Sequence, residues 1–304
     1  MGNLFSATGY LVESLSDLDE LITESTFGGF EDMFQFDYFG QELIGAVHDS
    51  GNGVELWGTF VSMQHQPYLV ALTPAYRGQT QISLTNWHIE EGDQNQYEFF
   101  LEGEDVKSGQ EVVCRAVNLL QYGSIEALET RETLTVGLSG LMLKGRVISS
   151  SANVTEDSWA IEEELWELQR RFEEGDASAE QEFLKEYEKF IKKISRSKSN
   201  PEGLPHVHRE FRHIEDFPDQ SKADSSVEGG LAKNSLYRIT GEVLDSRNFL
   251  NEETDTELLW MYVDVGPITI EIVINRDDLS GEPVHGSMLT GICWLEGFIG
   301  EEVQ

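Results

Sequence analysis

Potential metal-ligating side chains gather in one short stretch of the chain, HVHREFRHIED, which begins at His206. Imidazole and carboxylate groups are ligands that zinc and iron take in proteins. In an extended chain His206 and His208 share one side, which is a usable bidentate spacing. His206, His208 and His213 are therefore the candidate ligands of a metal site. We favour a solvated, histidine-rich linker over this site, because Arg209 and Arg212 lie between the ligands and would oppose a cation.

Motifs of the common enzyme classes are missing from the sequence. It contains no phosphate-binding loop GxxxxGK[ST], no dinucleotide fingerprint GxGxxG, no nucleophile elbow GxSxG and no zinc motif HExxH. The 56 Asp and Glu residues leave open a pair of carboxylates across a cleft. We therefore predict no catalytic residue and no cofactor. A metal-dependent hydrolase that uses His206, His208 and His213 is the alternative.

Aromatic side chains on the C-terminal strands are the candidates for recognition. Trp260, Tyr262 and Trp294 fall within runs that alternate like strands, and Arg276 follows one of these runs. Small barrels often bind ligands through such residues. If the chain has a partner-binding face, we predict that it lies around these four side chains. The alternative is that the tryptophans pack in the core.

The charge of the chain is strongly negative, at −35 from 21 basic and 56 acidic residues. Such a surface repels nucleic acid and anionic lipid, so neither is expected as a direct partner. Three explanations of the acidity remain. It provides solubility, it docks a basic protein partner, or it mimics nucleic acid and inhibits a basic protein. We favour a non-enzymatic, acidic interaction or adaptor protein, with the mimic as a further alternative.

Four segments make up the expected α+β fold. Residues 1–150 are predicted to form an N-terminal domain that is rich in strands. Its first four strands, at 34–39, 42–49, 54–63 and 67–74, are separated by turn residues and indicate a meander. Residues 151–195 have the pattern of a helical hairpin, and residues 196–235 the composition of a flexible polar linker.

The last segment, residues 236–304, predicts a small antiparallel barrel of the OB-like or SH3-like kind. Ile268, Ile270, Ile272 and Ile274 alternate with other residues, which places one apolar face toward a core. A hairpin turn is expected at Gly266. The runs LSGLMLKGRVI and LTGICWLEGFI are similar, and either a duplicated unit or shared strand composition explains them.

The C-terminal stretch INRDDLSGEPVHGSMLTGICWLEGFI resembles the signature of an uncharacterised bacterial family, a domain of unknown function of about this length. The segments TVGLSGLMLKGRVIS at 135–149 and PAYRG at 74–78 fit the same family. The resemblance implies a cytosolic bacterial protein, and it transfers no catalytic residue.

Two further observations favour a cytoplasmic location. Cys114 and Cys293 each fall in an apolar strand, which predicts two buried, reduced thiols. Residues Met1–Ser25 lack the basic segment of a signal peptide, and no apolar run is long enough to span a membrane.

Overall fold

The computed structural model describes residues 4–12, 17, 21, 32–63, 66–92, 97–148, 209–214 and 235–300. The chain divides into two compact units, one made of Met1–Val147 with Arg209–Gln304 and the other of Ile148–His208. Almost all the described residues lie in the first unit. The predicted helical hairpin, residues 151–195, lies outside the described residues.

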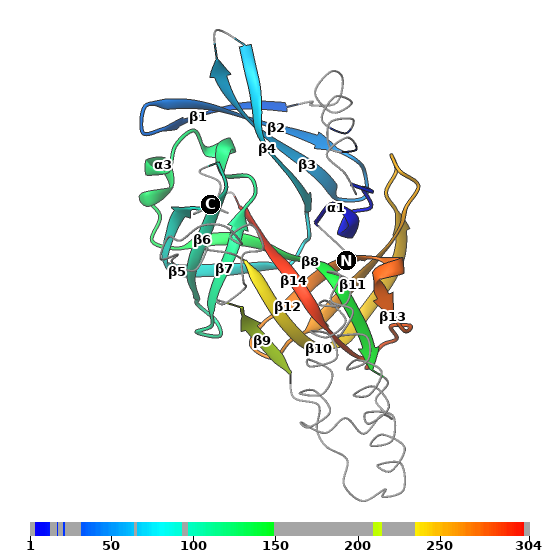
Figure 1. Cartoon of the computed structure of the whole chain (residues 1–304). Coiled ribbons are helices and arrows are strands. Elements are labelled where there is room, and N and C mark those ends of the chain that lie inside the picture. Colours follow the sequence, from blue (N-terminus) through cyan, green and yellow to red (C-terminus); the bar gives the residue numbers. More distant parts are fainter. Residues whose placement is uncertain are drawn as a thin grey trace, which may run out of the picture. The chain divides into compact units, whose positions relative to one another are not determined.

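An antiparallel meander of four strands forms the N-terminal sheet (Figure 1). Its strands are β1 (Asp32–Tyr38), β2 (Gln41–Asp49), β3 (Val54–Met63) and β4 (Gln66–Tyr76). Phe36 pairs with Leu43, and Leu43 with Val61, so all three point to one face, where they are buried in the main core. The sequence-based prediction of a meander is therefore confirmed.

The remaining strands belong to a second, larger sheet. In chain order its elements are β5 (Gln81–Glu91), β6 (Phe99–Asp105), β7 (Glu111–Ala116), η1 (Leu119–Tyr122), α3 (Glu126–Glu129), β8 (Leu134–Ile148), β9 (Glu210–His213), β10 (Leu236–Leu250), β11 (Glu257–Asp264), β12 (Thr269–Asn275), η3 (Arg276–Asp278), β13 (Leu279–Ser280) and β14 (Met288–Ile299). The strand β9 lies within the segment expected to be a linker.

The pairings of this sheet close two circuits of five strands that share β8 and β14. In the first circuit β8 pairs with β5, β5 with β6, β6 with β7, and β7 with β14. In the second circuit β14 pairs with β10, β10 with β11, β11 with β12, and β12 with β8. Closing a sheet on itself removes its unpaired edges, so each circuit is a small barrel.

The two barrels have the same topology. Each half of the sheet consists of an antiparallel three-stranded meander, a 3-10 turn and one long strand, in the order β5–β6–β7–η1–β8 and β10–β11–β12–η3–β14. In both halves the first strand is antiparallel to its own long strand. The third strand is parallel to the long strand of the other half. This approximate two-fold symmetry favours a duplicated unit as the reason that the β8 and β14 sequences are similar.

The interior of the barrels follows the alternation of apolar residues. Ile270, Ile272 and Ile274 are fully buried in the main core, as the alternation predicts. Cys114 on β7 and Cys293 on β14 are buried and free, which confirms the prediction of two reduced thiols. Gly266 has a φ of +104° in the turn between β11 and β12, so the predicted hairpin is also confirmed.

The predicted α+β class is wrong for the part of the chain that the structure describes, which is mostly β-strand. The α-helices with defined bounds are α1 (Leu4–Ala7) and α3, each of four residues. The C-terminal strands also do not close an antiparallel barrel by themselves, because β8 from the N-terminal half completes the circuit through a parallel pairing with β12. A local sequence pattern carries no signal for a pairing between such distant segments.

Candidate functional site

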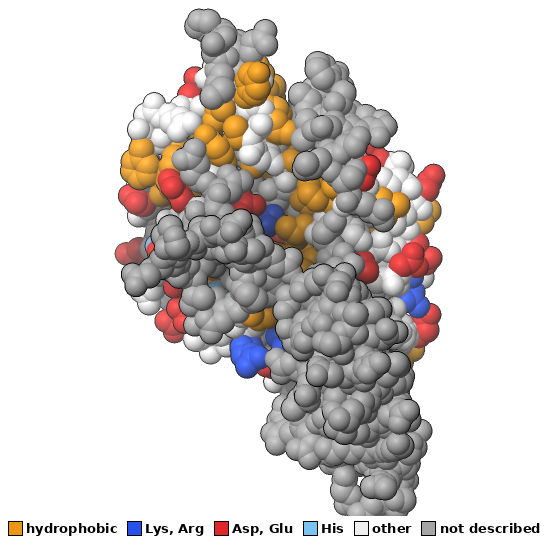
Figure 2. Space-filling model, in the orientation of Figure 1, with side chains coloured by type: hydrophobic (Ala, Val, Ile, Leu, Met, Phe, Trp, Pro, Cys, Tyr) orange, Lys and Arg blue, Asp and Glu red, His pale blue; other side chains and the backbone are white. Residues whose placement is uncertain are grey.

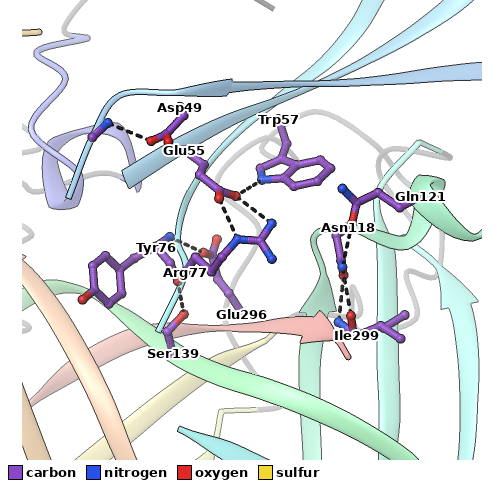
Figure 3. A network of polar contacts seen from close by, with 11 residues as sticks. Asp49, Glu55, Trp57, Tyr76, Arg77, Asn118, Gln121, Ser139, Glu296 and Ile299 are labelled. Carbon is purple, nitrogen blue, oxygen red and sulfur yellow. Dashed lines mark hydrogen bonds and ion pairs between the residues drawn. The ribbon is translucent and has the colours of Figure 1, made fainter. Parts of the chain in front are cut away.

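A row of polar side chains on the outer face of the barrels anchors the connection between β4 and β5. Tyr76, the last residue of β4, is held by both of its backbone groups (Figure 3). Its N–H donates to Oε2 of Glu296 on β14 at 3.3 Å, and its carbonyl accepts from Oγ of Ser139 on β8 at 2.7 Å. These buried side chains therefore join the meander to the barrels.

Glu271 on β12 fastens the next residues of the same connection. One carboxylate oxygen accepts from the N–H groups of Gln79 and Thr80 at 2.5 and 2.7 Å, and from Oγ1 of Thr80 at 3.0 Å. The other oxygen accepts from Nε1 of Trp260 at 2.7 Å. A buried carboxylate is tolerated when donors surround it in this way. Glu271 is an anchor of the fold and not a free acid.

Arg77 lies at the edge of this network and is partly exposed. Its guanidinium donates to both carboxylate oxygens of Glu55 on β3, at 2.6 and 3.2 Å. The guanidinium carbon also lies 4.5 Å from the centre of the Phe298 ring and 5.9 Å from that of Trp57. Nε1 of Trp57 donates to Glu55 at 2.7 Å. The ion pair and the aromatic rings thus hold one another in place.

Glu296 differs from the other two glutamates because its carboxyl group is incompletely bonded. Its Oε1 atom and the Nε atom of the neighbouring Arg115 are buried and have no hydrogen-bond partner in the part of the chain that the structure describes. Burial raises the pKa of the Glu296 carboxyl to about 8, although the Arg115 guanidinium opposes the shift. The carboxyl group is therefore mostly protonated at neutral pH.

A second polar cluster fixes the segment that follows α1. The buried hydroxyl group of Tyr10 donates to Oε2 of Glu253 at 2.6 Å and also bonds to Ser50. His48 bonds to the other oxygen of Glu253. Burial raises the pKa of Glu253, but the hydrogen bonds from Tyr10 and His48 outweigh it, so the pKa lies below its ordinary value. These contacts join three segments that are distant in the sequence, those of Tyr10, His48–Ser50 and Glu253.

The four predicted partner-binding residues all have packing or bonding partners. Trp260 bonds to Glu271, and its ring stacks on that of Tyr262 at 6.3 Å between centres. The Trp294 ring lies 5.4 Å from the guanidinium carbon of Arg115. Both tryptophans pack against a core cluster beneath α1, β3 and β4. Arg276 donates to the carbonyl of Leu279 at 3.3 Å and pairs with Glu282. The role of the four predicted residues in partner binding stays a prediction.

Of the three predicted metal ligands, the structure describes His213 alone. It lies on β9 opposite Tyr237, with ring centres 5.1 Å apart. His206 and His208 lie outside the described residues, so the metal site stays a prediction. In the ranges that the structure describes, no group of three or more His, Cys, Asp or Glu side chains is placed to hold a metal ion.

Three exposed hydrophobic side chains lie on the meander, which sequence reasoning did not single out. Phe39, Met33 and Tyr68 are 85%, 61% and 59% exposed. Figure 2 shows hydrophobic side chains spread over this sheet. Phe39 also has a φ of +48°, a left-handed conformation that bulky residues rarely adopt. The signal available in the sequence was a Phe-Gly pair at a two-residue hairpin turn, where Asn-Gly is the usual choice.

Comparison with known families touches only the C-terminal part of the chain. Residues 227–297 match the sequence profile of a family described as "Domain of unknown function, E. rectale Gene description (DUF3881)". The match runs from β10 into β14 and agrees with the resemblance to an uncharacterised family. No curated protein and no solved structure matches the chain. Among the described residues, no helix has the length and apolar character needed to cross a bilayer.

Proposed function

We propose that the protein is a non-enzymatic interaction protein that binds a basic protein partner through the β1–β4 meander. The observation that carries this proposal is Phe39, an aromatic side chain that is 85% exposed and held in a left-handed turn. A bulky residue costs about 1–2 kcal/mol in that conformation. Residues with backbone strain of this kind cluster at functional sites.

The other left-handed residues show how unusual Phe39 is. Apart from glycines, the described residues with positive φ are Asn52, Asn86, Asp255 and Phe39. Asn and Asp enter this conformation readily because their short polar side chains bond locally. Asn at position 39 would therefore relieve the strain and remove an exposed apolar surface. The chain has phenylalanine at this position instead, which supports a role in recognition.

Charge supports a basic partner. The first 76 residues contain eleven Asp or Glu and no Lys or Arg, and Arg77 is the first cation of the chain. The four meander strands carry five acids and no Lys or Arg, and one of the acids, Glu55, is paired with Arg77 just beyond β4. A partner with Lys or Arg beside apolar side chains would gain both attraction and apolar burial.

The experiment compares two substitutions of exposed apolar residues by asparagine. A basic protein recovered by low-salt co-purification is purified, and its affinity is measured by calorimetry. We expect Phe39→Asn to weaken binding at least about tenfold, because it removes an aromatic anchor worth roughly 1–3 kcal/mol. Val284→Asn is the matched control, since Val284 is 61% exposed but lies outside the meander. Equal affinities of the two variants would refute the proposal.

A bacterial, cytoplasmic location is part of the same proposal. It is supported by the two buried free thiols and by the description of the matching family, which names E. rectale. Disulfides are rare in a reducing cytoplasm, where a pair of unlinked cysteines is ordinary. Fractionation of cells that express the native protein tests the location.

A further inference from the structure

The strand β1 is an edge of the meander, since the sheet order is β1-β2-β3-β4 and β1 pairs with β2 alone. The other edge, β4, contains Pro67 and Pro74, which cannot donate to an added strand. β1 has no proline and its pairing with β2 shows no bulge. Proteins commonly protect the edge strands of a sheet with prolines and β-bulges, so β1 is the less protected of the two edges.

One hydrogen bond shows which backbone groups of β1 face away from β2. The N–H of Asp37 points away from β2 and donates to the carbonyl of Gly123 at 2.7 Å. Backbone groups along an antiparallel strand face alternate sides, so those of Met33 and Gln35 also face outward. No described residue forms a hydrogen bond with these outward backbone groups of Met33 and Gln35. Met33 is exposed, and so is Gln35.

We propose that β1 at Met33–Gln35 is the docking edge for an extended, basic segment of the partner, which adds as a fifth strand to the meander. The inference rests on the proposed function and specifies how the partner is held. Backbone bonds to Met33 and Gln35 supply the register, and alternate side chains of the segment contact Met33 and the acids of β1 and β2.

A second copy of this chain is the less suitable occupant. Pairing of two β1 strands would bring Asp32 and Asp37 of both copies together, and β1 contains no Lys or Arg to offset them. Like charges directly across a strand pair are destabilising. A segment that contains Lys would instead be attracted to the acids of β1. The occupant is therefore a basic strand, and self-association is an outcome that the experiment can report.

The test uses a capped ten-residue peptide of alternating Lys and Val as the probe and the full chain as the receptor. We expect hydrogen exchange at the amides of Met33 and Gln35 to slow when the peptide is bound. Gln35→Pro removes one outward donor without touching the ladder to β2, and it should weaken binding about tenfold. Gln35→Ala keeps the N–H and is the matched control.

Two further arms make the outcome decisive if Gln35→Pro unfolds. A peptide N-methylated at alternate residues loses donors and should bind the native chain about tenfold more weakly, and a Glu–Val peptide should not bind. Failure of the Lys–Val peptide to bind, protection at residues outside β1, or a peptide-independent dimer would overturn the docking edge. The proposed function fails separately, when the basic partner binds Phe39→Asn as tightly as the native chain.

Discussion

Replacing Glu296 with glutamine should stabilise the protein at neutral and alkaline pH. The carboxyl group is fully buried, accepts one hydrogen bond from Tyr76, and leaves Oε1 without a partner among the described residues. Glutamine has the same shape and no charge to desolvate. Its carbonyl oxygen can take over the bond from Tyr76.

The direction of the pH effect follows from the raised pKa. Burial raises the pKa of Glu296 from 4.5 to about 8, so the folded chain holds a proton that the unfolded chain releases above its ordinary pKa. Between these two values the native state binds more protons, and the free energy of unfolding falls as the pH rises. At about 1.4 kcal/mol per pH unit, the loss reaches roughly 3 kcal/mol at pH 7.

The assay is denaturant unfolding of both proteins at several pH values from about 5 to about 9. The difference in free energy between Glu296→Gln and the native protein should grow by about 3 kcal/mol from pH 5 to pH 7 and level off above pH 8. Glu282→Gln is the control, because Glu282 is 78% exposed and should give curves that stay parallel. A difference that is independent of pH would show that Glu296 is ionised and paired with Arg115 in the folded state.

Three other substitutions test the anchors of the fold by denaturant unfolding. Glu271→Gln should lower the free energy of unfolding by about 2–4 kcal/mol, because its amide NH₂ would face either the donors of the β4–β5 connection or Nε1 of Trp260; no loss would show that these hydrogen bonds are dispensable. Tyr237→Phe should cost about 1–2 kcal/mol and speed exchange of the Val113 amide, which donates to the Tyr237 hydroxyl at 2.8 Å. Tyr262→Phe is its control, and equal effects would count against the bond. Gly297→Ala should cost about 1–3 kcal/mol, since a Cβ there would lie 2.5 Å from Sγ of Cys114, whereas Gly137→Ala, with 3.6 Å to its nearest atom, should be mild.

Secondary structure could be predicted from the sequence wherever neighbouring residues form a recognisable pattern. The four meander strands and the hairpin at Gly266 were found because apolar alternation and turn residues mark them directly. The α+β class was wrong because β8 pairs with β5, β12 and β14, and the sequence records none of these long-range partners.

The residues of a partner-binding surface were harder to predict than the strands. Trp260 and Trp294 were chosen because exposed aromatics on strands often bind ligands, but burial depends on what covers the outer face. That cover comes from α1, β3 and β4, which are remote in the chain. The proposed role of Phe39 rests on its left-handed conformation, and this conformation becomes visible only when the length of the turn is known.

In the proposed function a basic partner binds the acidic, apolar meander. Calorimetric titration of the purified partner at about 50 and about 500 mM salt tests it most directly. We predict a stoichiometric complex with a partner rich in Lys and Arg, and an affinity that falls at least about tenfold at the higher salt. A complex whose affinity does not change with salt, or a partner without an excess of cations, would contradict the account.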